Sequence, residues 1–194
     1  LELLRSRCRM AHPPHIAAIS RALAVLTAVV LSSVAEAQQK AAEADVKVAY
    51  IFNFAKFTEW PPAFLPAGGA LAICVLGDDD LGPALSVLES KTVQGRAVRV
   101  RRGLRPEDIR GCHVLYFGAV DERTATDARR LAETHATLTL GDSEGFVERG
   151  GMVGLVKVDN RIAFDVNVEA THRASLKLSS QVLKLARAIR GRAS

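Results

Sequence analysis

The chain has 194 residues, with 26 Lys and Arg, 21 Asp and Glu, and a formal net charge of +5 at pH 7. After residue 37 the excess falls to 22 basic against 19 acidic residues, which is weak support for a nucleic-acid partner, and we expect none. The remaining 157 residues suit one compact domain with a sizeable core, so no second domain is expected.

The N-terminal segment has the layout of a secretory signal peptide. Basic residues at positions 5, 7, 9 and 21 precede the apolar run Ala22–Leu31, and Ala35-Glu36-Ala37 follows it with the small residues that a signal peptidase accepts. The run is too short for a permanent anchor, because a membrane span needs roughly 20 apolar residues. We therefore expect cleavage of residues 1–37, a periplasmic domain at 38–194, and no membrane anchor after cleavage.

The first element of the domain is expected to be a helix at Asp45–Trp60. Val46, Tyr50 and Phe54 recur at helical intervals, and apolar residues also cover a second face. A helix that is apolar on most sides is buried or partnered. The sequence Trp60-Pro61-Pro62 should end it, because proline restricts the residue before it and donates no backbone hydrogen bond.

Strands and helices then alternate along the chain. The expected strands are Leu71–Leu76, Ala97–Arg102, His113–Phe117, Thr137–Leu140, Met152–Val158 and Ile162–Val168, and the expected helices are Leu81–Ser90, Pro106–Arg110, Asp121–His135 and Gln181–Arg190. Alternation of this kind predicts a three-layer α/β fold, with a mostly parallel sheet of about six strands and helices on both faces. The tight turn Asp159-Asn160-Arg161 predicts a terminal antiparallel hairpin.

Two charged segments have structural as well as functional interpretations. Arg99 and Arg101 fall on one side of a strand, as expected of a solvated sheet edge, and an anionic ligand site is the alternative. Asp79 or Asp80 follows the first strand, where a magnesium site for a phosphorylated receiver domain would lie. The corresponding end of the next central strand carries no aspartate that could accept phosphate, so we expect one of these carboxylates to cap a helix.

No catalytic motif is found in the sequence. It contains no Gly-x-Ser-x-Gly elbow, no His-Glu-x-x-His helix and no glycine loop with the spacing of a phosphate cradle. We therefore expect a protein that is not an enzyme and that has no catalytic residue, cofactor or metal. The mature chain keeps only Cys74 and Cys112, which allow one disulfide or two buried thiols.

A series of local motifs resembles the YfiR family. They are Ala49–Pro61, Ile73–Gly77, Gln94–Arg96, Gly111–Tyr116, Gly150–Leu155, Ile162–Asn167 and Leu176–Leu183. The similarity covers nearly all of residues 44–190 in the same order. It implies a periplasmic α/β protein that binds the periplasmic sensor region of a transmembrane diguanylate cyclase and restrains it, so that cyclic-di-GMP signalling and biofilm formation fall.

The resemblance also implies roles for particular residues. Cys74 and Cys112 match the family's bridging cysteines, while the family's second bridge has no counterpart around Gly150–Val158. In a flavodoxin-like strand order the two cysteines would lie in or beside neighbouring strands, with Cα atoms about 5.5 Å apart. The positions associated with a small ligand are Glu59, Asp165, Lys177 and Ser179, and Glu59 stands where the characterised type has a basic residue.

The aromatic residues of the first helix have two interpretations. Phe52, Phe57 and Trp60 are most simply core residues, and the alternative is a homodimer or cyclase-binding surface. Three classes of function follow from the sequence: a periplasmic cyclase regulator, a small-molecule-binding module that feeds another envelope sensor such as a histidine kinase, and an unrecognised hydrolase. The hydrolase would need a pair of residues that activates water, and none is evident.

Overall fold

The structure is a computed structural model that describes residue 36 and residues 38–191. The predicted signal peptide therefore lies outside the described residues, apart from Glu36. The chain divides into two compact units, one up to Lys40 and one from Ala41 onward, and the second contains the fold. Among the described residues no helix combines the length and the apolar character needed to cross a membrane.

The second unit opens with a helix that runs to residue 56, called here the N-terminal helix. The strands that follow are β1 (Thr58–Glu59), β2 (Leu71–Leu76), β3 (Thr92–Val93), β4 (Arg96–Leu104), β5 (Val114–Phe117), β6 (Leu138–Gly141), β7 (Val153–Val158), β8 (Arg161–Asn167), β9 (Lys177–Leu178) and β10 (Ala188–Arg190). The other helices are η1 (Gly82–Ser90), η2 (Pro106–Ile109), α2 (Glu122–Thr134), α3 (Val168–Arg173) and α4 (Ser180–Leu183), of which η1 and η2 are 3₁₀-helices.

The main sheet has eight strands in the order β10-β8-β7-β6-β5-β2-β4-β3. The central pairs from β4 to β7 are parallel, and β7 and β8 form the predicted antiparallel hairpin. Asp159 and Asn160 both have positive φ (45° and 60°), which is the conformation of a tight two-residue hairpin turn. The predicted fold class is confirmed, with β3 and β10 extending the sheet beyond the predicted strands.

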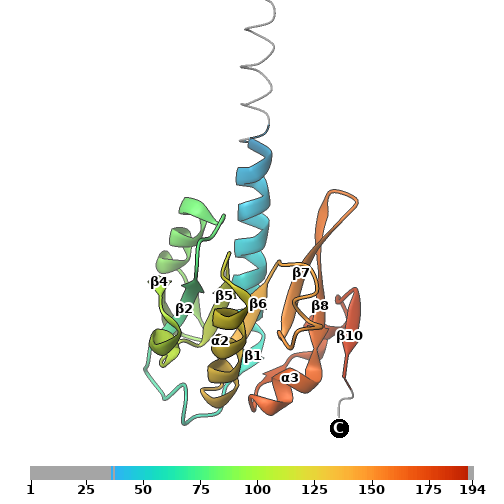
Figure 1. Cartoon of the computed structure of the whole chain (residues 1–194). Coiled ribbons are helices and arrows are strands. Elements are labelled where there is room, and N and C mark those ends of the chain that lie inside the picture. The colour runs from blue at the N-terminus through green and yellow to red at the C-terminus, as the bar shows by residue number, and fades with distance from the viewer. Residues whose placement is uncertain (1–35, 37, 192–194) are drawn as a thin grey trace, which may run out of the picture. The chain divides into compact units, whose positions relative to one another are not determined.

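Helices cover both faces of this sheet, which makes the fold three-layered (Figure 1). Side chains alternate along β2: Ile73 belongs to the same buried cluster as Ile51 of the N-terminal helix, whereas Cys74 belongs to a second cluster with Ala128 of α2. Such alternation is a consequence of the strand's period of two. Because β2 is buried along its whole length, its sequence is apolar at every position.

The predicted helix at Gln181–Arg190 is wrong over most of its length. Only Ser180–Leu183 is helical, and Ala188–Arg190 forms β10, parallel to β8. Arg187 lies within the predicted helix, but its guanidinium binds the Asp165 carboxylate of β8. This ion pair and the pairing with β8 are contacts between distant residues, and they outweigh the local preference for a helix.

The N-terminal helix also ends earlier than predicted, at residue 56 rather than at Trp60. Thr58 and Glu59 form β1, which pairs antiparallel with β9 in a separate two-stranded sheet. The buried Thr58 hydroxyl donates a hydrogen bond to the Phe54 carbonyl, 2.6 Å away, and so satisfies one of the last carbonyls of the helix. The proline pair therefore follows a short strand and does not end the helix directly.

Candidate functional site

A pocket of about 330 Å³ lies beside the small sheet of β1 and β9. Its lining comes from two distant segments, Glu59–Pro62 on one side and Ser175 with Lys177 on the other. The antiparallel register places Glu59 directly opposite Lys177, so a carboxylate and an ammonium stand on adjoining strands. A small molecule that carries both charges suits such a lining.

The structure brings together some of the predicted ligand-binding residues but not all of them. Glu59 and Lys177 line this pocket. Ser179 follows β9, where its backbone N–H donates to the Phe57 carbonyl and its hydroxyl accepts from the Gln181 N–H at the start of α4. Asp165 does not line the pocket, so the predicted set is divided between two places.

Asp165 lies in β8 and forms an ion pair with Arg187. The Arg187 Nε donates to Asp165 Oδ1 at 2.9 Å, and a second nitrogen of the guanidinium binds Oδ2. The hydrogen bond from Arg187 lowers the pKa of the Asp165 carboxyl despite the opposing effect of burial. Both residues line a smaller pocket of about 160 Å³, and their pairing fastens the segment before β10 to β8.

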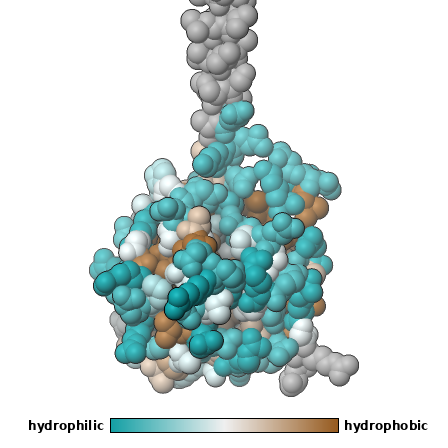
Figure 2. All heavy atoms as spheres, in the orientation of Figure 1, coloured by the Kyte–Doolittle hydropathy of each residue, from teal (hydrophilic) through white to brown (hydrophobic). Residues whose placement is uncertain are grey.

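The predicted partner-binding residues lie at the edge of the core. Phe52, Phe57 and Trp60 are partly buried and pack against the larger hydrophobic cluster, while Phe54 between them is fully buried. The Trp60 Nε1–H donates to the His113 carbonyl at 3.3 Å. The face drawn in Figure 2 is mostly hydrophilic, with hydrophobic residues in separate small groups.

His113 is a buried histidine held between two backbone segments. Its Nδ1 accepts from the Ala72 N–H at 2.9 Å, which leaves Nε2–H to donate to the Phe64 carbonyl at 3.1 Å. Burial lowers the pKa of His113; the hydrogen bond to Phe64 opposes this shift, and the charge of Arg96 adds to it. A neutral imidazole is therefore part of the folded structure, and it connects β2 with the loop that follows Trp60.

We expect the protein to lose stability as the pH falls below about 6.5, because the unfolded chain then takes up a proton that folded His113 resists. Above that pH the histidine is neutral in both states and its contribution is constant. His113→Asn should flatten this part of the pH dependence, since the amide oxygen still accepts from Ala72 but does not titrate. Urea unfolding over this pH range measures the effect, with exposed His172→Asn as the matched control. If His113→Asn leaves the dependence of the free energy of unfolding on pH unchanged, His113 is not the source of the loss of stability.

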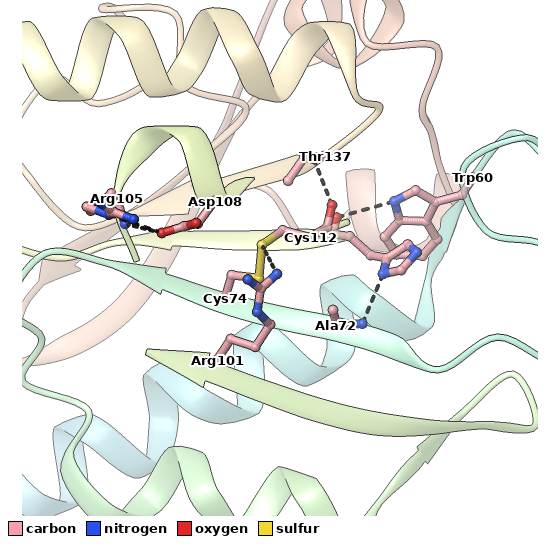
Figure 3. Close-up of a disulfide and its surroundings, with 9 residues drawn as sticks. Trp60, Ala72, Cys74, Arg101, Arg105, Asp108, Cys112 and Thr137 are labelled. Atoms are coloured by element: carbon pink, nitrogen blue, oxygen red, sulfur yellow. Dashed lines mark hydrogen bonds and ion pairs between the residues drawn. A yellow bond between two sulfur atoms is a disulfide. The ribbon is translucent and has the colours of Figure 1, made fainter. Parts of the chain in front are cut away.

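The predicted disulfide joins Cys74 and Cys112, with Cα atoms 5.9 Å apart (Figure 3). Cys74 lies in β2, and Cys112 precedes β5, the parallel neighbour of β2. Both cysteines are buried, and the Thr137 hydroxyl donates to the Cys112 carbonyl at 2.7 Å. The Arg101 guanidinium approaches Cys112 Sγ from β4, with Nη1 at 3.8 Å. The bridge therefore connects neighbouring strands on the α2 side of the sheet.

The usual ligand site of such a sheet is closed in this protein. β2 has β4 on one side and β5 on the other, and ligands commonly bind where the strand order reverses in this way. Here the two loops pair with each other: the Asp78 N–H donates to the Ala119 carbonyl, and the Ala119 N–H donates to the Asp78 carbonyl at 2.6 Å. A Cβ at Gly118 would lie only 2.1 Å from that carbonyl oxygen, so the close approach depends on glycine.

The predicted cap by Asp79 or Asp80 is wrong in position. The N-cap residue of η1 is Leu81, whose own side chain makes no capping hydrogen bond. Asp79 instead accepts from the N–H of Leu81 itself, at 3.0 Å, and binds Arg102 of β4. Asp80 accepts from the Lys47 ammonium at 2.6 Å. The contacts with Arg102 and Lys47 were not evident from the local sequence, because both cations belong to elements distant along the chain.

Lys47 is a buried cation at the centre of an ionic cluster that was not predicted from the sequence. It is 3% exposed, and its Nζ lies 2.6 Å from carboxylate oxygens of both Asp80 and Asp142 and 3.2 Å from Glu43. Burial opposes the charged form, but hydrogen bonds from the ammonium to Asp142 and Asp80 outweigh it and raise the pKa of Lys47. Burial and these carboxylates likewise raise the pKa of the nearby Tyr116 hydroxyl.

In the described part of the chain, no group of three or more His, Cys, Asp or Glu side chains is arranged to hold a metal ion. The carboxylates after β2 and β6 surround an ammonium instead.

A sequence model of DUF4154, described as YfiR/HmsC-like, matches residues 44–187. The match runs from the N-terminal helix to the arginine that pairs with Asp165, and so takes in nearly the whole fold. The chain belongs to the YfiR/HmsC-like family. The resemblance found in the sequence motifs is thereby confirmed. The YfiR/HmsC-like family is a regulatory rather than a catalytic family.

Two solved structures are similar to this YfiR/HmsC-like chain. A conserved domain protein from Vibrio cholerae O1 biovar El Tor strain N16961 aligns with a TM-score of 0.44 and 14% identity, over 66% of this chain and 57% of the other. The ABC domain in complex with L-Trp from Streptococcus pneumoniae aligns with a TM-score of 0.43 and 10% identity, over 62% of this chain and 55% of the other. The chain therefore spans little more than half the length of either protein.

Proposed function

We propose that this YfiR/HmsC-like protein is a periplasmic regulator that binds the periplasmic sensor region of a transmembrane diguanylate cyclase and restrains it. The observation that carries the proposal is the family match over residues 44–187. The Cys74–Cys112 disulfide supports an oxidising compartment such as the periplasm. From that side of the membrane, a protein reaches cyclic-di-GMP synthesis only through a partner that spans the membrane.

The contact surface of this proposal includes the partly buried aromatics Phe52, Phe57 and Trp60. Each packs against the core cluster and is only partly buried, so part of the residue stays accessible. Rings held in this way lose little conformational freedom when a partner covers them, which favours tight contacts. The same surface would serve a homodimer, and sedimentation of the protein alone and with the cyclase separates the two uses.

Deleting the gene is expected to raise cyclic-di-GMP and biofilm formation, because the cyclase loses its restraint. Extraction and mass spectrometry of the nucleotide measures the effect. A plasmid copy should restore the low level, whereas a copy without residues 1–37 should not, since that protein stays on the wrong side of the membrane. An unchanged nucleotide level in the deletion strain would contradict the proposal.

Capture of the partner tests the contact itself. The exported protein, used as bait on detergent-solubilised membranes, should retain a transmembrane diguanylate cyclase. The matched bait carries Phe57→Ala, which trims an accessible ring, and it should retain less of the cyclase than the wild type. Recovery of a histidine kinase in place of the cyclase would favour the second function described below.

The position of the mature N-terminus tests the predicted export signal. Protein recovered from the periplasmic fraction should have the intact mass of a chain that begins near Gln38. A cytoplasmic protein that keeps the segment before Gln38 would contradict both the cleavage and the proposed location.

The pocket beside β1 and β9 supports a second candidate function, a small-molecule-binding module that feeds another envelope sensor such as a histidine kinase. Trp60 is the one tryptophan of the chain and lines this pocket, so its fluorescence reports occupancy directly. A panel of free amino acids is the first probe, because Glu59 and Lys177 offer opposite charges to a zwitterion. Lys177→Gln should weaken any response, and exposed Lys184→Gln should leave it unchanged.

A further inference from the structure

The outer edge of β4 has a partner strand only at its start, although the helix η1 packs against β4. On its inner side β4 pairs with β2 from Val98 to Leu104. On its outer side it pairs only with the two residues of β3, opposite Arg96 and Ala97. Among the residues that the structure describes, no strand adjoins this outer edge from Arg99 onward.

Backbone groups on this edge are oriented to receive another strand. The Val98 N–H points outward, since it donates to the Lys91 carbonyl at 3.2 Å. Alternate residues of a strand direct their N–H and C=O groups to the same edge, so those of Val100 point outward too. The Val98 N–H is thus already bonded, and the unpaired groups of this edge begin at Val100, where they are a template for pairing with a further chain.

Arginine side chains flank the same edge. Arg99 and Arg101 stand opposite Ala72 and Cys74 of β2, so both project from the α2 face of the sheet. In the described chain neither forms an ion pair, and Arg101 has only the Cys112 sulfur as a polar neighbour. Arg102, in contrast, already binds Asp79. Two cations without carboxylate partners therefore accompany the open backbone.

We propose that the outer edge of β4 binds an extended acidic segment of a partner protein. The segment adds a strand beside Val100 and the residues of β4 that follow it, since the Val98 N–H is already bonded to Lys91, and its alternate carboxylates contact Arg99 and Arg101. This inference deepens the proposed function, on which it rests for the identity of the partner, by stating where the partner docks and what chemistry its docking segment has. Strand addition supplies main-chain hydrogen bonds, and the paired charges set the register.

An anionic membrane surface fits the same arginines less well. Binding to a lipid interface combines basic residues with apolar side chains that enter the bilayer. The exposed large hydrophobic residues of the described chain are Val46, Phe64, Val87, Val158, Leu185 and Ile189. Of these, Val87 alone lies in an element that packs against β4, the helix η1, and a single valine is a small apolar anchor for a lipid interface.

A synthetic peptide of about ten residues, with Glu at alternate positions and Val or Thr between them, is the probe, and the same peptide with Gln for Glu is its control. The mature wild-type protein should bind the Glu peptide, less tightly as salt rises, and the Val100 amide should gain protection from hydrogen exchange. Arg99→Gln with Arg101→Gln should weaken binding about two- to thirtyfold, as expected for two exposed charge pairs. The matched control is Arg123→Gln with Arg130→Gln, at exposed positions of α2, and it should leave the binding of the Glu peptide unchanged.

Several results would overturn the inference: no binding of the Glu peptide, an equal loss in the α2 variant, or binding of phosphatidylglycerol vesicles in place of the peptide. If the arginines serve only to prevent edge-to-edge aggregation, their removal would cause self-association while the peptide affinity stayed the same, which also overturns it. Capture of the cyclase is measured in parallel. Capture without peptide binding overturns this inference alone, and peptide binding without capture overturns the proposed function alone.

Discussion

Reducing the Cys74–Cys112 disulfide is expected to lower the free energy of unfolding by about 3–4 kcal/mol. The bridge joins residues 38 positions apart, and opening a loop of this size returns considerable entropy to the unfolded chain. Because 1 kcal/mol corresponds to roughly 2–4 °C in a domain of this length, the melting temperature should fall by about 6–16 °C. Thermal unfolding with and without reductant measures the difference.

Cysteine variants separate the bridge from other effects of the reductant. Cys112→Ser should melt near the temperature of the reduced wild type whether or not reductant is present. The double variant Cys74→Ala, Cys112→Ala is the better packed control, because it places no hydroxyl in this buried position. Titration of the unfolded, non-reduced wild type should find no free thiol from these residues, and two free thiols would contradict the bridge.

The parts of the fold that could be predicted from the sequence are those whose pattern is local. β2 and β5 are short apolar runs that end near glycine, and α2 has an aspartate cap and one apolar face. The β7–β8 hairpin is marked by Asp159-Asn160, residues that tolerate positive φ. In each case the residues that determine the element lie within it or next to it.

The C-terminal segment shows why other parts could not be predicted. Residues 181–190 contain good helix formers, and the sequence favours a helix there. The structure instead pairs Ala188–Arg190 with β8, and Arg187 forms the ion pair with the buried Asp165 carboxylate. Leaving that carboxylate unpaired would cost more than the helical preference of a few residues. Such a contact is not visible in any local pattern.

The candidate site was predicted only in part, because contacts between distant residues are not visible in a local sequence pattern. The resemblance named Glu59 and Lys177, which the β1–β9 pairing places opposite each other, but it also named Asp165, which pairs elsewhere. Lys47 was missed although the sequence contained a signal. It occupies the same helical stripe as Ile51 and Phe54, and a lysine on a buried stripe requires a counter-charge from another element.

Replacing Lys47 by methionine is expected to lower the free energy of unfolding by about 2–4 kcal/mol, because it leaves Asp80 and Asp142 without their shared cation. The loss should be smaller than for a fully buried pair, since these carboxylate side chains are 37% and 32% exposed and keep part of their hydration. Methionine retains the length of the lysine stem and much of its packing. Urea unfolding of the two proteins at neutral pH and moderate salt measures the difference.

Two comparisons identify the cause of the loss. Lys157→Met removes a lysine that also binds a carboxylate, Glu43 at 2.7 Å, but its side chain is 48% exposed, so the loss should stay within about 1 kcal/mol. Adding Asp142→Asn to Lys47→Met should restore part of the stability, because one unpaired carboxylate is removed, whereas Asp142→Asn alone should destabilise the wild type. A coupling energy of about 0.5–3 kcal/mol in this double-mutant cycle is expected. If Lys47→Met unfolds at the same urea concentration as Lys157→Met, the buried cluster does not fasten the N-terminal helix to the carboxyl ends of β2 and β6.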